Sequence, residues 1–557
     1  MRNLRDIYAN KAVSQIPRLL TLLDRNEFSK TYGSFQRTYW LDKSDDFVNA
    51  LPQYGVHSLA LVYNNRMPGN IFYKQEKIKK WTIAAIDYWT RIQHKDGSFD
   101  EFYPNEHGWA GPTGFLLYAM IESYKLFRKY ISNSMKDRFL ETCRKAAVFL
   151  GKYDEDGILA NHHAMALMPI YYAYDLLGDR KLKKLFHDKL NYFYTLVSKE
   201  GWSLEYDGAD LGYLSATVSF LSKLYKLYKH PRVFDIIKRS IEFSGYFVYP
   251  NGYYAGSMGS RQTLHFYPHG YEIFAKRIPL AGAIADKMLI GLNQGKLVPP
   301  EIQADRYFLY RIPEFLLSYI DYTPRGKKTL VPYERKPFQR YFSDGKFFVK
   351  KSDNYYFVSN FAKGGVMKVF DKKNNLIYND NGIIGKVGEK TATSQWINKK
   401  LVLDVDQDEI TINGKMSVVP SKVFNPYKGL VFRAVMLTLG SNTFLSYKLK
   451  GLIRKLIIFG DKKLPMEFNR NIKLGKTTIE VTDTLHNNSK KPIESMKFGD
   501  EFFVRYVPQS RYFQPEELKI KGYYLGKRDL RKLNDDGEIN VKRLLNIKTG
   551  KIEYSTF

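Results

Sequence analysis

The sequence of 557 residues contains a single cysteine, Cys143. One thiol excludes both a disulfide framework and a zinc site built from cysteine ligands. The chain also has no run approaching the roughly 20 apolar residues that span a bilayer, and residues 1–30 lack the apolar core of a signal peptide. We therefore expect a cytoplasmic protein without a transmembrane segment, or a periplasmic one if a leader has been removed.

Motifs that recognise nucleotides and nucleic acids are missing as well. The sequence has no GxxxxGKS or GxxxxGKT loop, no CxxC pair and no aromatic motif typical of single-strand binding. Nevertheless, 87 Lys and Arg against 57 Asp and Glu leave a formal charge of +30, which suits a polyanionic partner. Charge alone does not choose among nucleic acid, acidic lipid and acidic polysaccharide. Because the motifs are missing, we expect no nucleic-acid partner.

The spacing of apolar residues changes near residue 325. Before it, apolar and aromatic residues recur every three or four positions, which predicts helices. After it, short β-branched and aromatic runs alternate with turn residues, which predicts antiparallel strands. We expect a helical domain over residues 1–325 and a β domain over 326–557, with the boundary in Asp321–Tyr333.

The predicted helices are Ile78–Ile92, Thr113–Tyr130, Lys136–Tyr153, Met165–Leu177, Lys181–Val197, Tyr213–Tyr228 and Val233–Phe247. The predicted strands are Lys346–Lys350, Tyr355–Asn360, Leu401–Asp404, Glu409–Ile412, Phe432–Leu439, Thr478–Val481 and Phe502–Val507, with a tight turn at Asn413-Gly414.

A weak internal repeat runs through the helical half. Turns at Asp96-Gly97, Asp156-Gly157, Glu200-Gly201 and Asn251-Gly252 are separated by about the length of one helical hairpin. Stacked hairpins of this size close into an α/α toroid or extend as a solenoid. In either arrangement the equivalent loops emerge at one end, so we expect the polar residues that follow these turns to meet in one cleft.

The first candidate residues stand at a predicted helix start. Asn161, His162 and His163 follow the second of these turns and precede an apolar helix. Asn161 is either a helix cap, since its side chain can accept from the free N–H groups of the first turn, or a substrate ligand. The two adjacent histidines must point in different directions, so packing alone explains them poorly. A helix N-terminus also favours an anion such as a substrate carboxylate.

The second candidate loop combines carboxylates and tyrosines. Its members are Glu205, Tyr206, Asp207, Asp210 and Tyr213. A pair of carboxylates suits the general acid and base of a glycosidase. A tyrosine transfers a proton instead if a nearby cation or histidine lowers its pKa. Helix capping also explains the two aspartates, so these alternatives stay open.

Two further loops carry histidines. In residues 259–270, the spacing of His265 and His269 would suit a metal on a helix, but Pro268 between them disfavours a regular helix, so we expect no metal. Arg261 is then an anion clamp and a histidine the acid or base. The other loop, residues 96–107, ends in Glu106 and His107 and has the polar and aromatic composition of a sugar-binding loop.

These motifs together resemble the heparinase II/III-like family. The resemblance rests on DGSFDEFYPNEH at 96–107, NHHAMALMPIYYAYDLLGD at 161–179, SLEYDGADLGYLS at 203–215 and GSRQTLHFYPHG at 259–270. The β half adds YYFVSNFAKGGVMKVFD at 355–371 and Ser394-Gln395-Trp396, so the resemblance spans roughly residues 30–510. It implies an incomplete α/α toroid followed by an antiparallel β-sandwich, which agrees with the periodicity.

The resemblance also implies a polysaccharide lyase that acts on a uronate-containing chain by β-elimination. Asn161 matches the asparagine that pairs with the uronate carboxylate and so acidifies the C5 proton. His162 matches a base or carboxylate partner, and Tyr213, with Tyr206 in reserve, matches the tyrosine that transfers a proton. We assign catalysis to Asn161, His162, Tyr213 and His265, and substrate binding to His163, Glu106, His107, Tyr206, Glu205, Arg261 and His269.

No cofactor is expected. The family draws a further histidine, and in some members zinc ligands, from the β-sandwich, whereas this β half has only His486 and no cysteine. Three other functions remain open: a uronyl C5-epimerase, a catalytically silent protein that binds an acidic glycan in surface-polysaccharide synthesis, and a glycosidase that uses Glu205 with Asp207 or Asp210. The sequence leaves the oligomeric state undetermined.

Overall fold

The computed structural model of the chain describes residues 4–153, 159–326, 328–420, 425–458, 462–489, 491–502, 504 and 511–557. All seven predicted helices are confirmed, with ends shifted by a few residues. Helices of the first part of the chain are α1 (Leu4–Val13), α2 (Ile16–Leu22), α3 (Arg37–Trp40), α4 (Gly55–Asn64), α5 (Glu76–Arg91), α6 (Ala110–Phe127), α7 (Asn133–Lys152), α8 (Ala160–Leu177), α9 (Arg180–Thr195), α10 (Leu211–Leu227), α11 (Pro231–Gly245), α12 (His269–Phe274), α13 (Pro279–Asn293) and α14 (Asp305–Ile320).

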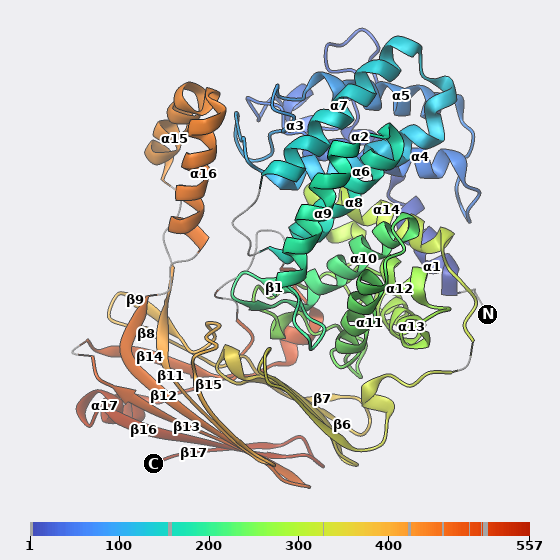
Figure 1. Cartoon of the computed structure of the whole chain (residues 1–557). Helices are drawn as coiled ribbons and strands as arrows, with labels where there is room; N and C mark the ends of the chain where they lie inside the picture. The colour runs from blue at the N-terminus through green and yellow to red at the C-terminus, as the bar shows by residue number, and fades with distance from the viewer. Residues whose placement is uncertain are drawn as a thin grey trace.

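These helices form an α/α toroid. The even-numbered helices from α4 to α14 each pack against the next, and α14 returns to α4, so they make an inner ring (Figure 1). Helices α5, α7, α9, α11 and α13 lie outside this ring, and α1 packs between α13 and α14. The apolar residues of the inner helices are buried on nearly all sides, because neighbours surround them. The predicted fold class is confirmed.

Two of the repeated glycines show why the loops return to the same end. Gly97 and Gly201 have φ angles of 92° and 100°, which side-chain-bearing residues rarely adopt. A Cβ atom on Gly97 would lie 2.3 Å from the carbonyl oxygen of Lys145, and one on Gly201 would lie 2.3 Å from that of Arg239. Each turn is therefore pressed against an outer helix further along the chain. The Asp156-Gly157 turn lies outside the described residues.

The second part of the chain builds two antiparallel sheets. The small sheet is a meander of β3 (Phe338–Phe342), β4 (Phe347–Lys351), β5 (Tyr355–Asn360), β6 (Val366–Asp371) and β7 (Leu376–Asp380). The large sheet has the order β15-β14-β8-β9-β11-β12-β13-β16-β17, with β10 paired to β11. Its strands are β8 (Ile383–Val387), β9 (Lys390–Thr393), β10 (Val402–Asp406), β11 (Glu409–Val419), β12 (Lys463–Leu474), β13 (Thr478–Asn487), β14 (Ile493–Phe498), β15 (Tyr523–Tyr524), β16 (Glu538–Asn546) and β17 (Ile552–Thr556), and α17 (Lys527–Asp535) packs beside them.

The small sheet joins the toroid to the large sheet. Along β5, Tyr356 and Val358 belong to the hydrophobic core of the helices, whereas Tyr355 and Phe357 belong to the core of the sandwich. Successive side chains of a strand point to opposite faces, so one buried strand serves both cores. The Tyr356 hydroxyl also donates to the carbonyl of Tyr246 at 2.6 Å. This packing fixes the sandwich beneath the toroid (Figure 1).

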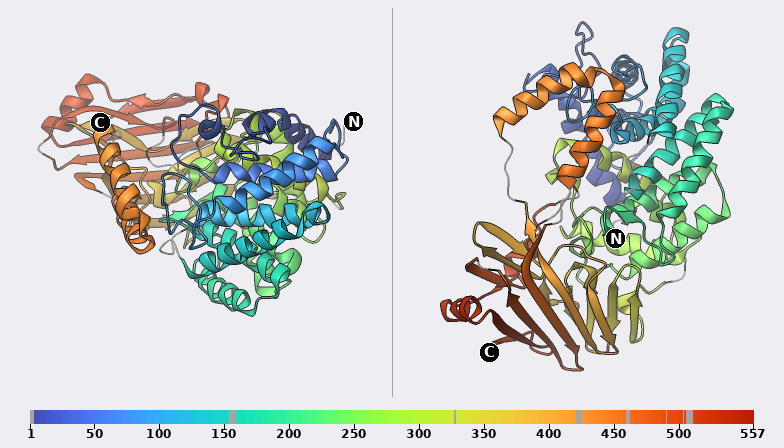
Figure 2. Two further views of the ribbon diagram at one scale, coloured as in Figure 1. Left: turned by 90° about the horizontal axis from the view of Figure 1, so that it is seen from above. Right: turned by 60° about the vertical axis from the view of Figure 1, so that its left-hand side comes forward.

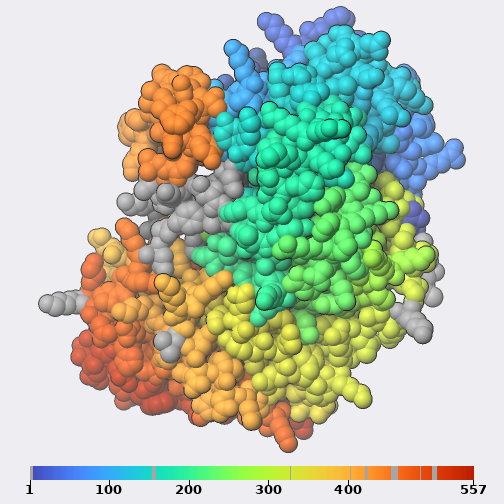
Figure 3. Space-filling view, in the orientation of Figure 1, coloured from blue at the N-terminus to red at the C-terminus, as the bar shows by residue number. Residues whose placement is uncertain are grey.

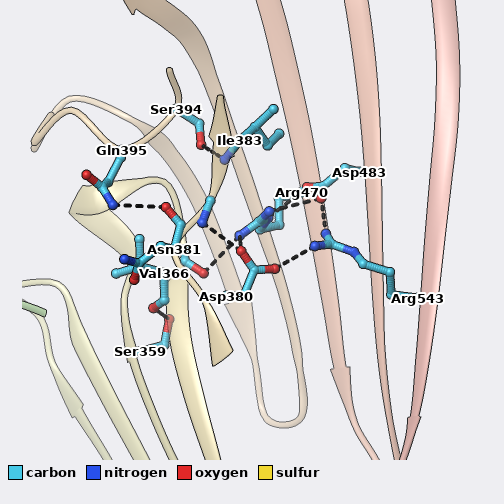
Figure 4. A network of polar contacts seen from close by, with 12 residues as sticks. Ser359, Val366, Asp380, Asn381, Ile383, Ser394, Gln395, Arg470, Asp483 and Arg543 are labelled. Atoms are coloured by element: carbon cyan, nitrogen blue, oxygen red, sulfur yellow. Dashed lines mark hydrogen bonds and ion pairs between the residues drawn. The ribbon is translucent and has the colours of Figure 1, made fainter. Parts of the chain in front are cut away.

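A buried ionic network ties the two sheets together (Figure 4). Arg470 of β12 donates to both carboxylate oxygens of Asp483 on β13, at 2.7 and 2.9 Å. Arg543 of β16 donates to Asp483 and, at 2.6 Å, to Asp380 of the small sheet. Burial raises the pKa of Asp380, but the two arginines outweigh it and leave that pKa below its ordinary value. The two aspartates and two arginines thus pair with one another inside the sandwich, as a buried charge requires.

Two predictions in the β half are wrong. Phe432–Leu439 is not a strand but part of helix α15 (Pro426–Thr438), because Asn425 caps that helix by accepting from Tyr427 N and Pro426 suits its first turn. Asn413-Gly414 is not a turn but the middle of β11, where it pairs with β12. A Cβ atom on Gly414 would lie 2.4 Å from the Leu401 side chain, so the glycine permits close packing.

Helices α15 and α16 (Thr443–Ile458) form a helical arm inserted between β11 and β12. In the right-hand view of Figure 2 the arm stands clear of the strands and reaches the loops of the toroid. The predicted strand Phe502–Val507 lies largely outside the described residues. Within the described ranges, none of the helices has the length and apolarity needed to cross a membrane.

Candidate functional site

Asn161 and Glu205 form the centre of the candidate site. Asn161 lies in the first turn of α8, and its backbone nitrogen and Nδ2 each donate to one carboxylate oxygen of Glu205 at 2.6 Å. Asn161 therefore does not cap its helix. Glu205 lies on the short strand β1 (Leu204–Glu205), which pairs with β2 (Gly208–Ala209), and is fully buried. Burial raises the pKa of Glu205 well above its ordinary value, although the bonds from Asn161 oppose this shift. The two hydrogen bonds to Glu205 thus fix the orientation of the Asn161 side chain.

His162 faces a chain of aromatic and charged groups. Its ring lies 5.2 Å from the ring of Trp109, measured between centroids. Trp109 Nε1 donates to one oxygen of Glu101 at 2.5 Å, and Arg306 Nε donates to the other at 2.5 Å. Glu101 is 3% exposed, so its charge is neutralised by Arg306 out of contact with water.

Tyr213 belongs to the same group through α14. The Tyr213 and Tyr307 side chains share a hydrogen bond, and Tyr307 follows Arg306 in the first turn of α14. Burial raises the pKa of Tyr213 well above its ordinary value, and the neighbouring Tyr307 and Tyr206 add to this shift. His265 stacks on Tyr307 with ring centroids 4.9 Å apart, and its Nδ1 lies 3.2 Å from Nε2 of Gln303.

Asp210 holds the remaining two loops in register. It caps α10 by accepting from Tyr213 N at 3.1 Å, and its other oxygen accepts from Arg261 N at 2.9 Å. The Arg261 guanidinium lies over the Tyr206 ring, 3.8 Å from the centroid. Tyr206 has φ 62°, a left-handed conformation at the tip of the β1–β2 hairpin. Asp210 therefore positions both a cation and a tyrosine.

A buried lysine of the β half fastens the Arg261 loop. Lys363 Nζ donates to the carbonyls of Ser257 at 2.6 Å and Gly259 at 2.8 Å. Burial lowers the pKa of Lys363 to about 7, although Asp210 and Glu501 act in the opposite direction. The sandwich thus helps to set the geometry of a loop that belongs to the toroid.

Four residues predicted to bind substrate have contacts that fix loops and helix ends. His163 packs against Tyr192 of α9, and Glu106 accepts from Phe102 N and Lys450. His107 Nδ1 lies 2.8 Å from Asp96. His269 is fully buried, and its Nε2 lies 2.5 Å from Oδ2 of Asp321, the residue that follows α14. Their contacts organise loops and helix ends, so we leave these four out of the proposed site.

Sequence reasoning did not find Trp109, Arg306, Tyr307, Tyr512 or Lys450. Arg306 and Tyr307 begin α14, a helix with an aspartate in its first turn that could have been recognised as a start signal. Tyr512 approaches His265 with centroids 5.5 Å apart, and Lys450 of the arm lies 4.2 Å above the Trp109 ring. Trp109 stands two residues after the predicted loop 96–107, but in sequence nothing links the other four residues to the predicted loops.

No described group of three or more His, Cys, Asp and Glu side chains is arranged to hold a metal ion. The candidate site groups one amide, two arginines, two histidines, several tyrosines and the carboxylates of Glu101, Glu205 and Asp210, with Tyr512 contributed by the β half. Such arginine, amide, histidine and tyrosine groups can bind a carboxylate and transfer protons.

The toroid followed by a two-sheet sandwich is the architecture of known polysaccharide lyases. Heparinase III superposes with a TM-score of 0.50 at 8% identity, covering 100% of this chain and 91% of that one. Chondroitin AC lyase from Streptomyces coelicolor A3 gives a TM-score of 0.50 at 8% identity, and the match covers 89% of this chain and 68% of that lyase. A xanthan lyase from Paenibacillus gives 0.48 at 11% identity, and this chain, matched over 89% of its residues, spans 47% of that lyase.

Residues 67–268 match the family model of the ulvan lyase N-terminal domain. The matched residues include Asn161, His162, Glu205, Tyr213 and Arg261. A search of curated protein sequences finds no match. The resemblance to polysaccharide lyases of the toroid type, noted from the loop motifs, is confirmed.

Proposed function

We propose that this protein is a polysaccharide lyase of the heparinase II/III type that cleaves an acidic, uronate-containing polysaccharide by C5 proton abstraction and β-elimination. The observation that carries the proposal is the buried Asn161–Glu205 pair, which holds an amide donor beside His162, Tyr213 and two arginines. The formal charge of +30 supports a polyanionic substrate, because it attracts such a chain over long distances.

Asn161 recognises the uronate carboxylate. The Nδ2 group has two hydrogens, of which Glu205 takes one, so the second can be donated to a substrate oxygen. The start of α8 and the nearby Arg261 add positive potential at the same place. As the C5 proton leaves, negative charge grows on the carboxylate, and these fixed donors stabilise it where it forms.

His162 and Tyr213 are the proton-transferring pair. His162 accepts the C5 proton, the electrons of the C5–H bond form the C4–C5 double bond, and the C4–O bond breaks. The departing glycosidic oxygen takes a proton from Tyr213. A phenol with a raised pKa stays protonated and fits the role of donor, and Tyr307 then shares the charge through its hydrogen bond.

The test is incubation of the purified protein with a panel of uronate polysaccharides while following the ultraviolet absorbance of the new C4–C5 double bond. Asn161→Ala and Tyr213→Phe should each lower kcat by about 100-fold or more. The matched controls Asn293→Ala and Tyr524→Phe alter exposed residues away from the site and should leave kcat unchanged. Full activity in both site variants would refute the assignment. Solvent deuterium entering C5 without a double bond would indicate an epimerase instead.

A further inference from the structure

The helical arm carries an apolar surface that the other described residues leave exposed. Of the 23 large hydrophobic side chains exposed in the described chain, eight belong to the arm, which spans only residues 425–458. They are Tyr427, Leu430, Val431, Leu437, Leu439, Phe444, Leu445 and Leu452, and their exposed fractions lie between 40% and 77%. Such a concentration on so short a segment marks an interaction surface.

These side chains form continuous stripes. On α15, Tyr427, Leu430, Val431 and Leu437 follow helical spacing along one face, and on α16 the exposed positions Phe444, Lys448 and Leu452 recur every four residues. Between the helices, an apolar groove of about 460 Å³ is lined by side chains of both, Val431 and Leu449 among them. The arm forms a distinct lobe at the edge of the molecule (orange in Figure 3).

The opposite side of the arm is already occupied by the toroid. Lys450 Nζ lies 2.7 Å from Glu106, Ser446 Oγ donates to the Asn105 carbonyl at 2.6 Å, and Arg433 lies 3.3 Å from Asp46. These contacts fix which face looks outward. The exposed stripes are therefore a surface left for a partner outside this chain.

Charge indicates what that partner is. Residues 425–458 contain six Lys and Arg and no Asp or Glu, and Lys428 and Lys448 are exposed beside the apolar stripes. A surface that docks a protein partner normally carries charges of both signs. An apolar stripe bordered only by cations suits an anionic lipid surface, where the apolar side chains enter the acyl boundary and the cations contact lipid phosphates. We propose that the arm docks the protein on a membrane rich in anionic lipid.

The proposal is independent of the lyase assignment and is tested with the full chain. The probes are sedimenting vesicles of phosphatidylglycerol with phosphatidylcholine, and vesicles of phosphatidylcholine alone. The wild-type protein should bind the anionic vesicles and bind them less as salt is raised. Leu430→Gln/Val431→Gln/Phe444→Gln should lower the partition coefficient at least about tenfold, since three apolar side chains lose their burial. Lys428→Gln/Lys448→Gln should weaken binding and flatten its salt dependence.

The matched control is Ile71→Gln/Leu518→Gln, which removes two side chains of 75% and 78% exposure outside the arm and should bind as the wild type does. Thermal unfolding confirms that each variant is folded. The proposal is overturned if wild-type protein stays in solution with both kinds of vesicle, or if the triple variant binds as strongly as the wild type. It is also overturned if light scattering finds a dimer that the triple variant abolishes while vesicles bind neither protein, because the partner is then a second copy.

Discussion

Replacing Asn161 by aspartate would keep the shape of the side chain but put a carboxylate oxygen, which accepts hydrogen bonds, in place of the Nδ2 donor. In the protein, Asn161 Nδ2 donates to Glu205 at 2.6 Å, and the two residues are only 3% and 0% exposed. Asn161→Asp therefore brings two carboxyl groups within hydrogen-bonding distance in a site without bulk water. Two such groups cannot both ionise, so the pair retains one proton. Because burial already raises the pKa of Glu205, the pair should hold this proton well above the ordinary range.

The sign of the pH effect follows from that proton. A carboxyl whose pKa is raised by folding contributes stability at low pH, and this stability is lost as pH rises through the folded-state pKa. The variant should thus fold nearly normally in acid, where the shared proton replaces the lost hydrogen bond. In alkali it should lose about 3 kcal/mol, the usual cost of an uncompensated buried charge. Wild-type Asn161 has no proton to lose, so its pair lacks this additional dependence.

Activity should fall at every pH, because the substrate carboxylate meets an acceptor in place of a donor. Loss of one donor to a developing negative charge costs about 3–4 kcal/mol, or roughly 100- to 1000-fold in kcat. Chemical denaturation across a pH series and the ultraviolet assay measure the two effects separately. Asn161→Ala is the control, since it should lose similar activity, and because it adds no second carboxyl its stability should fall less steeply with rising pH than that of Asn161→Asp. If Asn161→Asp is as active as the wild type, or its stability follows the wild-type pH curve, the pair does not act as described.

Three further changes test other parts of the structure. Asp483→Asn removes a negative charge that the buried Arg470 and Arg543 both contact, and it should lower the free energy of unfolding by about 3–5 kcal/mol in denaturant titration. Asp188→Asn, at an exposed ion pair, is the control and should change it by under about 0.5 kcal/mol. In the wild type, Lys363 should make the free energy of unfolding rise between pH 7 and 10.5 by up to about 5 kcal/mol, because the folded chain binds fewer protons than the unfolded chain in that window. Lys363→Met should remove this rise, and an unchanged pH profile would contradict the prediction. Lys450→Met removes the cation beside Glu106 and should raise the pKa of that carboxyl further. Hydrogen exchange at the Phe102 amide, which donates to Glu106 at 2.7 Å, should become faster. Unaltered exchange would show that the arm does not hold this loop in place.

The toroid could be predicted because the sequence features that specify it, helical spacing and glycine turns, are local. Each helix shows apolar residues at helical spacing, and the glycine turns at Gly97 and Gly201 recur at hairpin intervals. The β half was predicted less well, since the predicted strand Phe432–Leu439 covers only the later part of α15, and the start of that helix depends on the short signal Asn425-Pro426. An isolated apolar run suits a strand or a buried helix equally, so local pattern alone does not decide between them.

The sequence by itself predicted which loops contribute to the candidate site, because polar residues cluster after turns, where helix packing does not require them. Only the tertiary structure decided which of these side chains contact one another. Glu205 and His269 look like surface ligands in sequence, yet Glu205 supports Asn161 and His269 is an interior histidine hydrogen-bonded to Asp321. Arg306 enters the site from a segment about 200 residues away from its partner Glu101. A contact across that separation is made by the closure of the helical ring, which no local pattern encodes.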